Sequence, residues 1–493
     1  KLNEPEDTVS QLLAEELEKF KSIWQKIQET FKCSIIQNNF ELPDYRTLGN
    51  LDFSDIHGKT NFINCLNSEF ANYARNNKNF FINDINYLSA SIGLQQWFDK
   101  TFWYAYKYAF NYDLIPDFAH NLAKIIQAIY GKSKKCLVVD LDNTLWGGVI
   151  GDDGVNNIKI GRETAVAEAY TGFQEYIKEL KERGIILAVC SKNELKNAQE
   201  GFLHPDSVLK LNDFASFQVN WEPKPQNILQ IASDINIGLD SIVFIDDNPA
   251  EREIVKAQIP LVAVPEIGSD ITKFIEFIDR NRYFEPAFLS EENLQRGKYY
   301  DDNNKRAEFK SKFDSYGDFL KSLEMKAEIG PFIPVYFNRI TELINKTNQF
   351  NLTTKRYNYS QVEKIATDDC YINIFLRLKD KFGDNGLVSI VSSEIKNGDE
   401  CHIDLWLMSC RVLKRDVEFV MFDGLVAECW KKNLKTIYGY YFPTNKNSMV
   451  ADFYENLGFR CLSREEGCSV WKYDINDGCI IGKNFIEVIY KED

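Results

Sequence analysis

The sequence predicts an α/β protein of several domains, built around a parallel sheet. Its 493 residues exceed what one hydrophobic core usually serves. Short apolar runs alternate with amphipathic helical segments between residues 136 and 246, a pattern typical of parallel strands buried on both faces. A mixed succession of strands and helices from about residue 324 onward indicates a further, α+β domain.

Composition excludes several classes of protein. Hydrophobic residues at 44% and charged residues at 27% are ordinary globular values, so a disordered or fibrous chain is excluded. A net charge of −15 argues against a nucleic-acid-binding protein. Eleven cysteines without a CxxC motif indicate reduced thiols and a cytoplasmic location. No apolar run reaches the ~18 residues of a membrane span, and no signal-peptide core is seen at the start.

Four regions follow from changes in pattern along the chain. Residues 1–130 are expected to be a mostly helical N-terminal region, beginning with an amphipathic helix up to about residue 30. Residues 131–290 form the α/β domain and 324–493 the α+β domain. Between them, 291–323 is charged and predicted to be a helical connector.

Within the α/β domain, strands and helices alternate. The expected helices cover 165–183, a stretch after Asn193, and 225–236. The expected strands are 136–141, 185–190, 217–219 and 241–246.

Chemically active side chains follow these strands where each one ends. They are, in chain order, Asp140, Asp142, Ser191, Lys224, Asp246 and Asp247. Ligand sites of open parallel sheets lie outside the carboxyl ends of the strands, so these side chains are predicted to meet in one crevice. They suit phosphoryl transfer through a carboxylate nucleophile, with a hydroxyl and an ammonium holding the spectator oxygens. Oxygen-only ligands predict Mg²⁺ as the cation that relieves the repulsion between the two anions.

This ordered set resembles the haloacid dehalogenase (HAD) superfamily. The resemblance implies that Asp140 is the nucleophile and a metal ligand. It makes Asp142 the general acid/base, with its backbone carbonyl on Mg²⁺. It also implies that Ser191 and Lys224 hold the phosphoryl group, while Asp246 ligates the metal and Asp247 supports the metal shell. A DxD pair alone is a weak signal, since surface aspartates often occur in pairs.

Further motifs narrow the resemblance to the FkbH-like family of HAD subfamily IIIC. They are DLDNTLWGGVIGDDG, CSKN, FIDDNPAERE and the segment Asn345–Leu352 with the preceding Leu343 and Ile344. No large cap domain fits between the motifs, so an open, Rossmann-like domain is expected. The family implies removal of phosphate from 1,3-bisphosphoglycerate or a similar three-carbon acyl donor. It further implies transfer of the acyl group, as a thioester, to the phosphopantetheine of an acyl carrier protein, as in polyketide biosynthesis.

Acyl transfer requires a thiol, and Cys190 is the candidate within the chain. We expect it to lie near Lys224 and Mg²⁺, which would favour a thiolate. The alternative is a structural cysteine, because Ile185–Cys190 is an apolar strand and cysteine is often buried.

The last region resembles an N-acetyltransferase-like (GNAT-like) domain. Strand 402–408 is followed by Arg411 and helix 416–431. The resemblance makes Arg411 a candidate cofactor-binding residue at a pyrophosphate-binding loop. Lys414 and Asp416 occupy positions that are glycine in the family pattern, which puts binding of CoA or pantetheine through this loop in doubt. The polar segment Asn345–Leu352 is either a loop bonding its own backbone or a contact with the HAD domain.

The N-terminal region partly resembles an SGNH hydrolase. Asp117 and His120 have the Asp-x-x-His spacing that completes a Ser/His/Asp triad, although no Gly-Asp-Ser turn precedes them. An aspartate near a helix start and a surface histidine explain the same residues. For the whole chain, the alternatives to an acyl-transferring enzyme are a plain Mg²⁺-dependent phosphatase and a carrier-docking scaffold.

Overall fold

The structure is a computed structural model that describes residues 2–289, 299, 302–303, 305–306, 309–310, 312–475 and 485–491. The chain divides into two compact units. The first comprises 1–130 with 356–367, and the second comprises 131–355 with 368–493. Most of 290–311 lies outside the described residues, so the predicted connector is seen only in part, where α15 (Tyr316–Ser322) is helical. Across the described part of the chain, no helix is both long and apolar enough to cross a bilayer.

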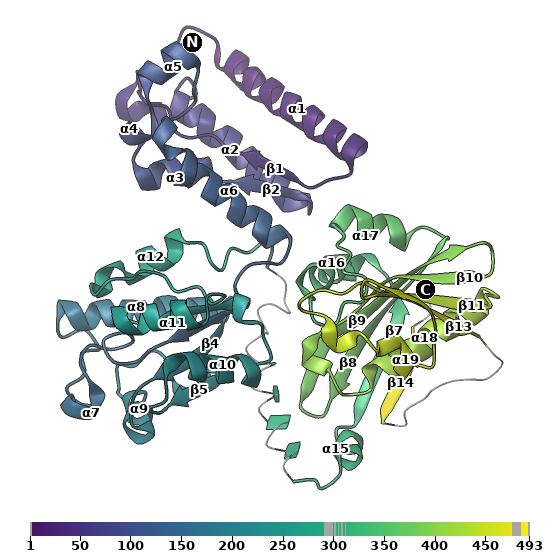
Figure 1. Cartoon of the computed structure of the whole chain (residues 1–493). Helices are drawn as coiled ribbons and strands as arrows, with labels where there is room; N and C mark the ends of the chain where they lie inside the picture. Colours follow the sequence, from purple (N-terminus) through teal and green to yellow (C-terminus); the bar gives the residue numbers. More distant parts are fainter. Residues whose placement is uncertain are drawn as a thin grey trace. The chain divides into compact units, whose positions relative to one another are not determined.

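The first unit is mostly helical, as the sequence predicts (Figure 1). Its helices are α1 (Glu6–Phe31), α2 (Lys59–Asn76), α3 (Ile85–Ile92), α4 (Leu94–Trp97), α5 (Lys100–Tyr106), α6 (Ile115–Ile129) and α17 (Tyr359–Ala366). The apolar face of α1 buries Trp24 against Phe70 and Phe80. Sequence patterns did not indicate the parallel pair β1 (Ile35–Asn38) and β2 (Phe80–Asn83), because four-residue strands give too short an alternation to detect.

The α/β domain of the second unit contains a four-stranded parallel sheet. Its strands are β3 (Cys136–Val139), β4 (Ile186–Ser191), β5 (Ser216–Val219) and β6 (Ile242–Ile245), in the order β5-β4-β3-β6. The helices are α7 (Ile150–Asp153), α8 (Ala165–Glu182), α9 (Leu195–Gly201), α10 (Lys224–Asp234), α11 (Pro249–Gln258) and α12 (Phe274–Arg280).

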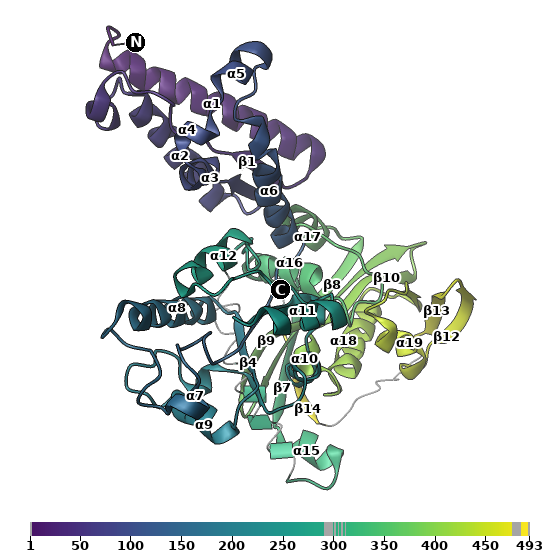
Figure 2. The same cartoon turned by 60° about the vertical axis from the view of Figure 1, so that its left-hand side comes forward.

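Alternate strand residues serve two separate cores, one on each face of the sheet. Leu137 and Val139 pack with α8 and α12 on one face. Val138 and Ala188 pack with α10 and α11 on the other. Figures 1 and 2 label the helices of this domain. Successive strand side chains point to opposite faces, so a strand covered on both sides must be apolar at every position. This explains the continuous apolar runs in the sequence.

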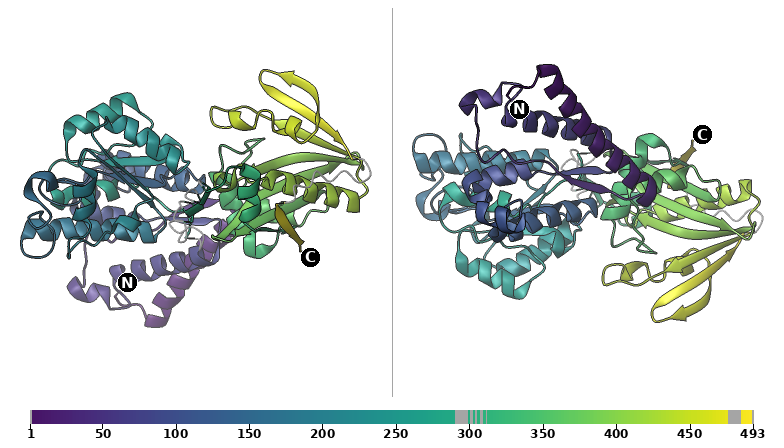
Figure 3. Two further views of the ribbon diagram at one scale, coloured as in Figure 1. Left: turned by 90° about the horizontal axis from the view of Figure 1, so that it is seen from below. Right: turned by 90° about the horizontal axis from the view of Figure 1, so that it is seen from above.

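The C-terminal domain is built on an eight-stranded mixed sheet in the order β12-β13-β11-β10-β9-β8-β7-β14. The strands are β7 (Met325–Pro331), β8 (Tyr371–Asp380), β9 (Gly383–Lys396), β10 (Glu400–Met408), β11 (Thr436–Tyr441), β12 (Arg460–Glu465), β13 (Cys468–Asp474) and β14 (Ile486–Tyr490). Helices α16 (Phe337–Lys346), α18 (Val417–Lys431) and α19 (Phe453–Asn456) complete the α+β order. Figure 3 shows the β12–β13 hairpin, in yellow, at the end of this domain. The sequence did not predict this hairpin or β14.

Segment Asn345–Leu352 lies against β10 and β11. Leu352 N donates to Trp406 O at 3.2 Å, and Met408 N donates to Phe350 O at 3.1 Å. On the other side, Phe442 N donates to Leu352 O at 2.9 Å. Local side-chain bonding also occurs, since Asn345 Nδ2 donates to Thr341 O at 3.0 Å. The segment is therefore hydrogen-bonded to the sheet through its backbone, so a loop that bonds only its own backbone accounts for part of it.

Candidate active site

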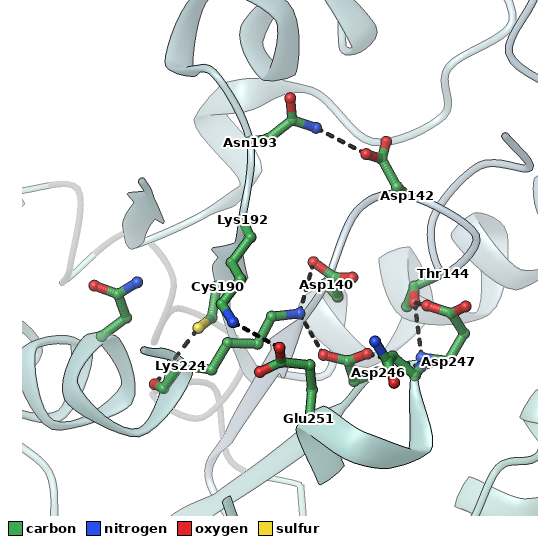
Figure 4. Close-up of polar contacts among 12 residues, drawn as sticks. Asp140, Asp142, Thr144, Cys190, Lys192, Asn193, Lys224, Asp246, Asp247 and Glu251 are labelled. Atoms are coloured by element: carbon green, nitrogen blue, oxygen red, sulfur yellow. Dashed lines mark hydrogen bonds and ion pairs between the residues drawn. The ribbon is translucent and has the colours of Figure 1, made fainter. Parts of the chain in front are cut away.

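The ends of β3, β4 and β6 bring the polar side chains together. Val139 pairs in register with Val189 on one side and with Ile245 on the other. Asp140, Cys190 and Asp246 therefore follow at the same level along three neighbouring strands, as Figure 4 shows. In the fully described stretch between β3 and α8, α7 with its four residues is the only helix, so this side of the site carries no large cap.

A buried lysine joins two of the carboxylates. Lys224, the first residue of α10, places Nζ 3.1 Å from Asp140 Oδ1 and forms an ion pair with Asp246 Oδ2. Its side chain is 3% exposed. Burial, the largest single influence, lowers the pKa of Lys224, but Asp140 and Asp246 together outweigh it and raise the pKa above its ordinary value. The ammonium is therefore held charged at the centre of the site.

Three carboxylates form a set that can hold a cation. Ligand oxygens of Asp140, Asp246 and Asp247 all lie within 4.8 Å of one another. Burial, followed by the charge of Asp140, raises the pKa of both Asp246 and Asp247. Besides its ion pair, Asp140 Oδ1 is buried and accepts no hydrogen bond from any described residue. Oxygen ligands crowded in this way fit a hard divalent cation such as Mg²⁺.

Asp142 is turned away from this cluster and is held by three donors. Its Oδ1 accepts from Trp146 Nε1 at 2.9 Å and from Ile150 N at 3.1 Å. Its Oδ2 accepts from Asn193 Nδ2 at 2.9 Å (Figure 4). Burial raises the pKa of Asp142, and the charges of Asp140 and Asp247 add to the effect. A carboxyl with a raised pKa suits general acid work.

Residues that the sequence reasoning did not single out hold the metal-binding loop. Thr144 is buried, accepts from Asp247 N at 3.2 Å and donates to Asp247 Oδ1 at 3.3 Å. Arg252 on α11 donates from Nη1 to the carbonyls of Asp246 and Asp247, both at 2.8 Å. Both residues, like Asn193, belong to the quoted motifs, but a motif match does not say which atom each contacts.

Cys190 and Ser191 are the last two residues of β4, and their side chains lie in different surroundings. Ser191 is 2% exposed at the last strand position, beside the site. Cys190 points into the core between the sheet and α10, with Sγ 3.8 Å from Lys224 O. Burial raises the pKa of Cys190 to about 12, and the opposing influence of Lys224 is smaller. The prediction that Cys190 lies in surroundings that favour a thiolate is therefore wrong, because desolvation of the thiol outweighs the effect of the nearby ammonium.

The loop after β10 lies in the C-terminal domain. Arg411 Nε donates to Ser409 Oγ at 3.1 Å, and the guanidinium lies 4.3 Å from the ring centroid of Tyr299. Lys414 and Asp416 have φ of 64° and 62°, so the backbone keeps the left-handed conformation of a glycine loop. The cofactor-binding role of Arg411 stays a prediction.

The pair proposed for a hydrolase triad lies on α6 in the first unit. Asp117 is in the first turn of the helix, and both Asp117 and His120 are exposed. This placement agrees with an aspartate near a helix start and a surface histidine, and the SGNH-like resemblance stays a prediction.

Comparisons with known proteins agree with this geometry. The FkbH N-terminal domain family matches residues 3–127. The N-terminal part of protein BF1531 from Bacteroides fragilis, which contains a phosphatase domain and was crystallised with Mg, is 38% identical. That match covers 58% of this chain and 75% of that one, with a TM-score of 0.55. No curated protein matches the sequence.

Solved acetyltransferases match the C-terminal domain at a lower level. The ribosomal-protein-S18-alanine N-acetyltransferase from Escherichia coli is 11% identical over 32% of this chain and 97% of that chain, with a TM-score of 0.25. A score this low adds no argument to the order of strands and helices described above.

The fold and the strand-end carboxylates define a phosphatase-type enzyme of the HAD superfamily. The chain belongs to the FkbH family.

Proposed function

We propose that the enzyme removes a phosphoryl group from 1,3-bisphosphoglycerate, or a similar three-carbon acyl phosphate, and that the acyl group passes to the pantetheine thiol of an acyl carrier protein. The observation that carries the phosphatase part is the cluster of Asp140, Lys224 and Asp246, in which a carboxylate and an ammonium meet at a metal-type site. A bound Mg²⁺, held by Asp140, Asp246 and Asp247, would supply charge neutralisation as two anions approach.

The chemistry decides which phosphate Asp140 takes. Attack on the acyl phosphate phosphorus would leave a free carboxylate, which cannot acylate a thiol. Asp140 Oδ therefore attacks the phosphorus of the phosphate ester, the P–O bond to the alcohol breaks, and an aspartyl-phosphate forms. The alcohol leaves as an alkoxide and needs a proton, which Asp142 can give because its pKa is raised. Water, deprotonated by Asp142, then releases inorganic phosphate from Asp140.

The acyl phosphate end remains for thioester formation. The carrier thiolate attacks the carbonyl carbon, the C–O bond to phosphate breaks, and phosphate leaves with the electron pair. Because Cys190 is buried and its pKa is raised, the proposal gives this step to the carrier thiol and does not route the acyl group through Cys190. The absence of a large helix between β3 and α8 leaves room for a substrate borne on a carrier.

A second candidate is a plain Mg²⁺-dependent phosphatase. The observation that favours it is the loop after β10, where side chains of Lys414 and Asp416 replace glycines of the family pattern. One experiment separates the two functions. The full chain is incubated with 1,3-bisphosphoglycerate, Mg²⁺ and a panel of holo carrier proteins, and intact masses of both proteins are followed. A glyceryl adduct on a carrier supports acyl transfer, whereas phosphate release without any adduct supports the plain phosphatase.

Two variants control this experiment. Asp140→Asn is expected to abolish phosphate release from the ester. Cys190→Ala is expected to keep carrier loading, and loss of loading with retained phosphate release would restore Cys190 as the acyl-carrying residue.

A further inference from the structure

The first unit contains a large cavity at the carboxyl ends of its two parallel strands. The cavity has a volume of about 980 Å³, and the lining residues that the structure describes all lie between Val9 and Phe118. They include Asn38, the last residue of β1, and Ile85, which follows the end of β2 by two positions. Ligand sites of parallel α/β structures lie outside the carboxyl ends of the strands. The cavity is therefore in the place where this fold positions a ligand.

Aromatic rings make up much of the cavity wall. The rings of Trp97 and Phe110 stack with their centroids 4.9 Å apart, and Phe110 stacks on Phe118 at 5.4 Å. Phe40 and Phe98 belong to the same lining. Stacked rings hold one another in place, so this wall is formed before a ligand arrives. Such apolar walls favour a ligand that is itself mostly apolar.

Charged side chains of the lining are engaged with neighbouring groups. Lys100 Nζ lies 3.0 Å from Asp44 Oδ2, and Lys59 Nζ lies 3.8 Å from the centroid of the Tyr45 ring. The carboxylate of Asp99 accepts hydrogen bonds from two backbone N–H groups in the first turn of α5. A charged ligand would have to compete with these contacts. They therefore favour a neutral ligand.

Two polar groups of the lining, the indole of Trp97 and the carboxyl of Glu41, are placed differently. Trp97 is fully buried, and its Nε1 has no partner at hydrogen-bond distance among the described residues. Burial is the largest influence on Glu41 and raises its pKa, whereas its own backbone N–H and the nearby indole of Trp97 lower the pKa by less. A buried N–H without a partner is unfavourable, and an acceptor that enters beside it removes that cost.

We propose that this cavity is a binding site for a neutral, largely apolar small molecule that carries a hydroxyl group. The hydroxyl oxygen accepts from Trp97 Nε1, and the hydroxyl hydrogen is donated to the carboxyl of Glu41. A hydroxyl both accepts and donates, which is what this pair of side chains requires. The rest of the molecule packs against the aromatic wall. The proposal is independent of the function assigned to the second unit.

Binding is tested on the full chain by isothermal titration calorimetry with 1-naphthol, naphthalene and 1-naphthoate. At about pH 7.5 the naphthol hydroxyl is neutral and the naphthoate carboxylate is charged. Naphthalene is the most apolar of the three probes and would bind at least as tightly as 1-naphthol if apolar burial alone decided affinity. We expect 1-naphthol to bind about tenfold or more tightly than either of the others, because only its neutral hydroxyl satisfies both side chains.

The variant Trp97→Phe keeps an aromatic ring and removes the N–H donor. It should weaken 1-naphthol binding about tenfold and change naphthalene binding much less, so the preference for the hydroxyl is lost. The matched control is Trp430→Phe on α18 of the C-terminal domain, where the tryptophan is 50% exposed, and it should keep the preference. Thermal unfolding followed by circular dichroism checks that each variant is folded. Glu41→Leu, which removes the acceptor at a half-buried position, gives a second test if Trp97→Phe is unstable.

Three results would overturn the proposal. The first is that 1-naphthol does not bind to the full chain. The second is that naphthalene or 1-naphthoate binds as tightly as 1-naphthol, which would mean that the hydroxyl is not recognised. The third is that folded Trp97→Phe or folded Glu41→Leu keeps the wild-type preference for 1-naphthol over naphthalene.

Discussion

The loop after β3 and the loop after β10 both need left-handed backbone, and they obtain it differently. In the phosphatase loop the left-handed positions fall to Asn143, with φ of 54°, and to Gly148, with φ of 97°. Asn143 Oδ1 also accepts from Gly148 N at 2.9 Å, which closes the turn. In the loop after β10 the same conformation falls to Lys414 and Asp416. Glycine adopts the left-handed conformation without a steric clash, and an asparagine side chain can stabilise it with a local hydrogen bond. A lysine side chain offers no such local hydrogen bond.

The two regions also differ in which charged side chains are gathered there. Around Asp140 three carboxylates lie close together, and the ammonium of Lys224 pairs with two of them, Asp140 and Asp246. In the C-terminal domain, one buried carboxylate, that of Glu342, pairs with two cations, Arg339 and Lys346. The comparison shows that left-handed backbone is supplied by asparagine and glycine in the loop after β3, and by lysine and aspartate in the loop after β10.

The largest test removes the nucleophile. Asp140→Asn should lower phosphatase kcat by about 10³-fold or more, because the neutral amide does not attack phosphorus to form the aspartyl-phosphate. Steady-state release of phosphate from a generic phosphate ester measures this. The same substitution at exposed Asp152 on α7 is the control and should have little effect. Retained activity in Asp140→Asn would end the assignment of the site.

The central ion pairs offer the next test. Lys224→Met should cost about 3–5 kcal/mol of unfolding free energy without Mg²⁺, because it leaves buried Asp140 and Asp246 without their cation. Urea unfolding followed by circular dichroism measures the loss. Adding Mg²⁺ should recover part of the lost unfolding free energy. If Lys224→Met is as stable as the wild type without Mg²⁺, the carboxylates do not repel one another.

Mg²⁺ should stabilise the protein in a pH-dependent way. The pKa of Asp246 is raised to about 6, so the folded protein binds this proton more readily than the unfolded chain. Stability of the metal-free protein therefore falls as pH rises from the ordinary carboxyl range through about 6. Bound Mg²⁺ should restore the stability that is lost when Asp246 ionises. The shift in Tm on adding Mg²⁺ should therefore be larger at about pH 7.5 than at about pH 5. Equal shifts in Tm at both pH values would contradict this prediction. Asp247→Asn, which removes one proposed ligand of Mg²⁺, should reduce the shift in Tm.

A smaller effect is expected from Asn193, which positions Asp142. Asn193→Ala should lower kcat about tenfold and leave KM nearly unchanged. Losing a donor to the carboxylate raises the pKa of Asp142 further, so the alkaline limb of the kcat profile should move to higher pH. Asn193→Ser, which keeps a hydroxyl donor, should recover part of the rate. An unmoved pH profile would assign Asn193 a purely structural role.

The smallest effect concerns the loop after β10. Lys414→Gly should raise the unfolding free energy by about 0.5 kcal/mol, since glycine adopts the observed φ of 64° without strain. Thermal unfolding measures the gain, and phosphatase activity should not change. A loss of stability would mean that the Lys414 side chain contributes more than its backbone strain costs.

Apolar runs and helix start and stop signals in the sequence predicted much of the architecture. The runs at 136–141 and 241–246 predicted buried parallel strands, because a strand covered on both faces must be apolar throughout. The order of Asp140, Ser191, Lys224 and Asp246 at strand ends then predicted one crevice. Short elements such as β1, β2 and the β12–β13 hairpin escaped detection, since each depends on pairing with a distant segment more than on its own pattern.

By itself, then, the sequence determined the class of fold and predicted that Asp140, Lys224 and Asp246 meet at the strand ends. It could not determine that Cys190 faces the core, that Asn193 holds Asp142, or that Trp97 and Glu41 line one cavity. The physical reason is that desolvation and electrostatic field depend on the three-dimensional surroundings of a group, which residue type and spacing along the chain do not specify.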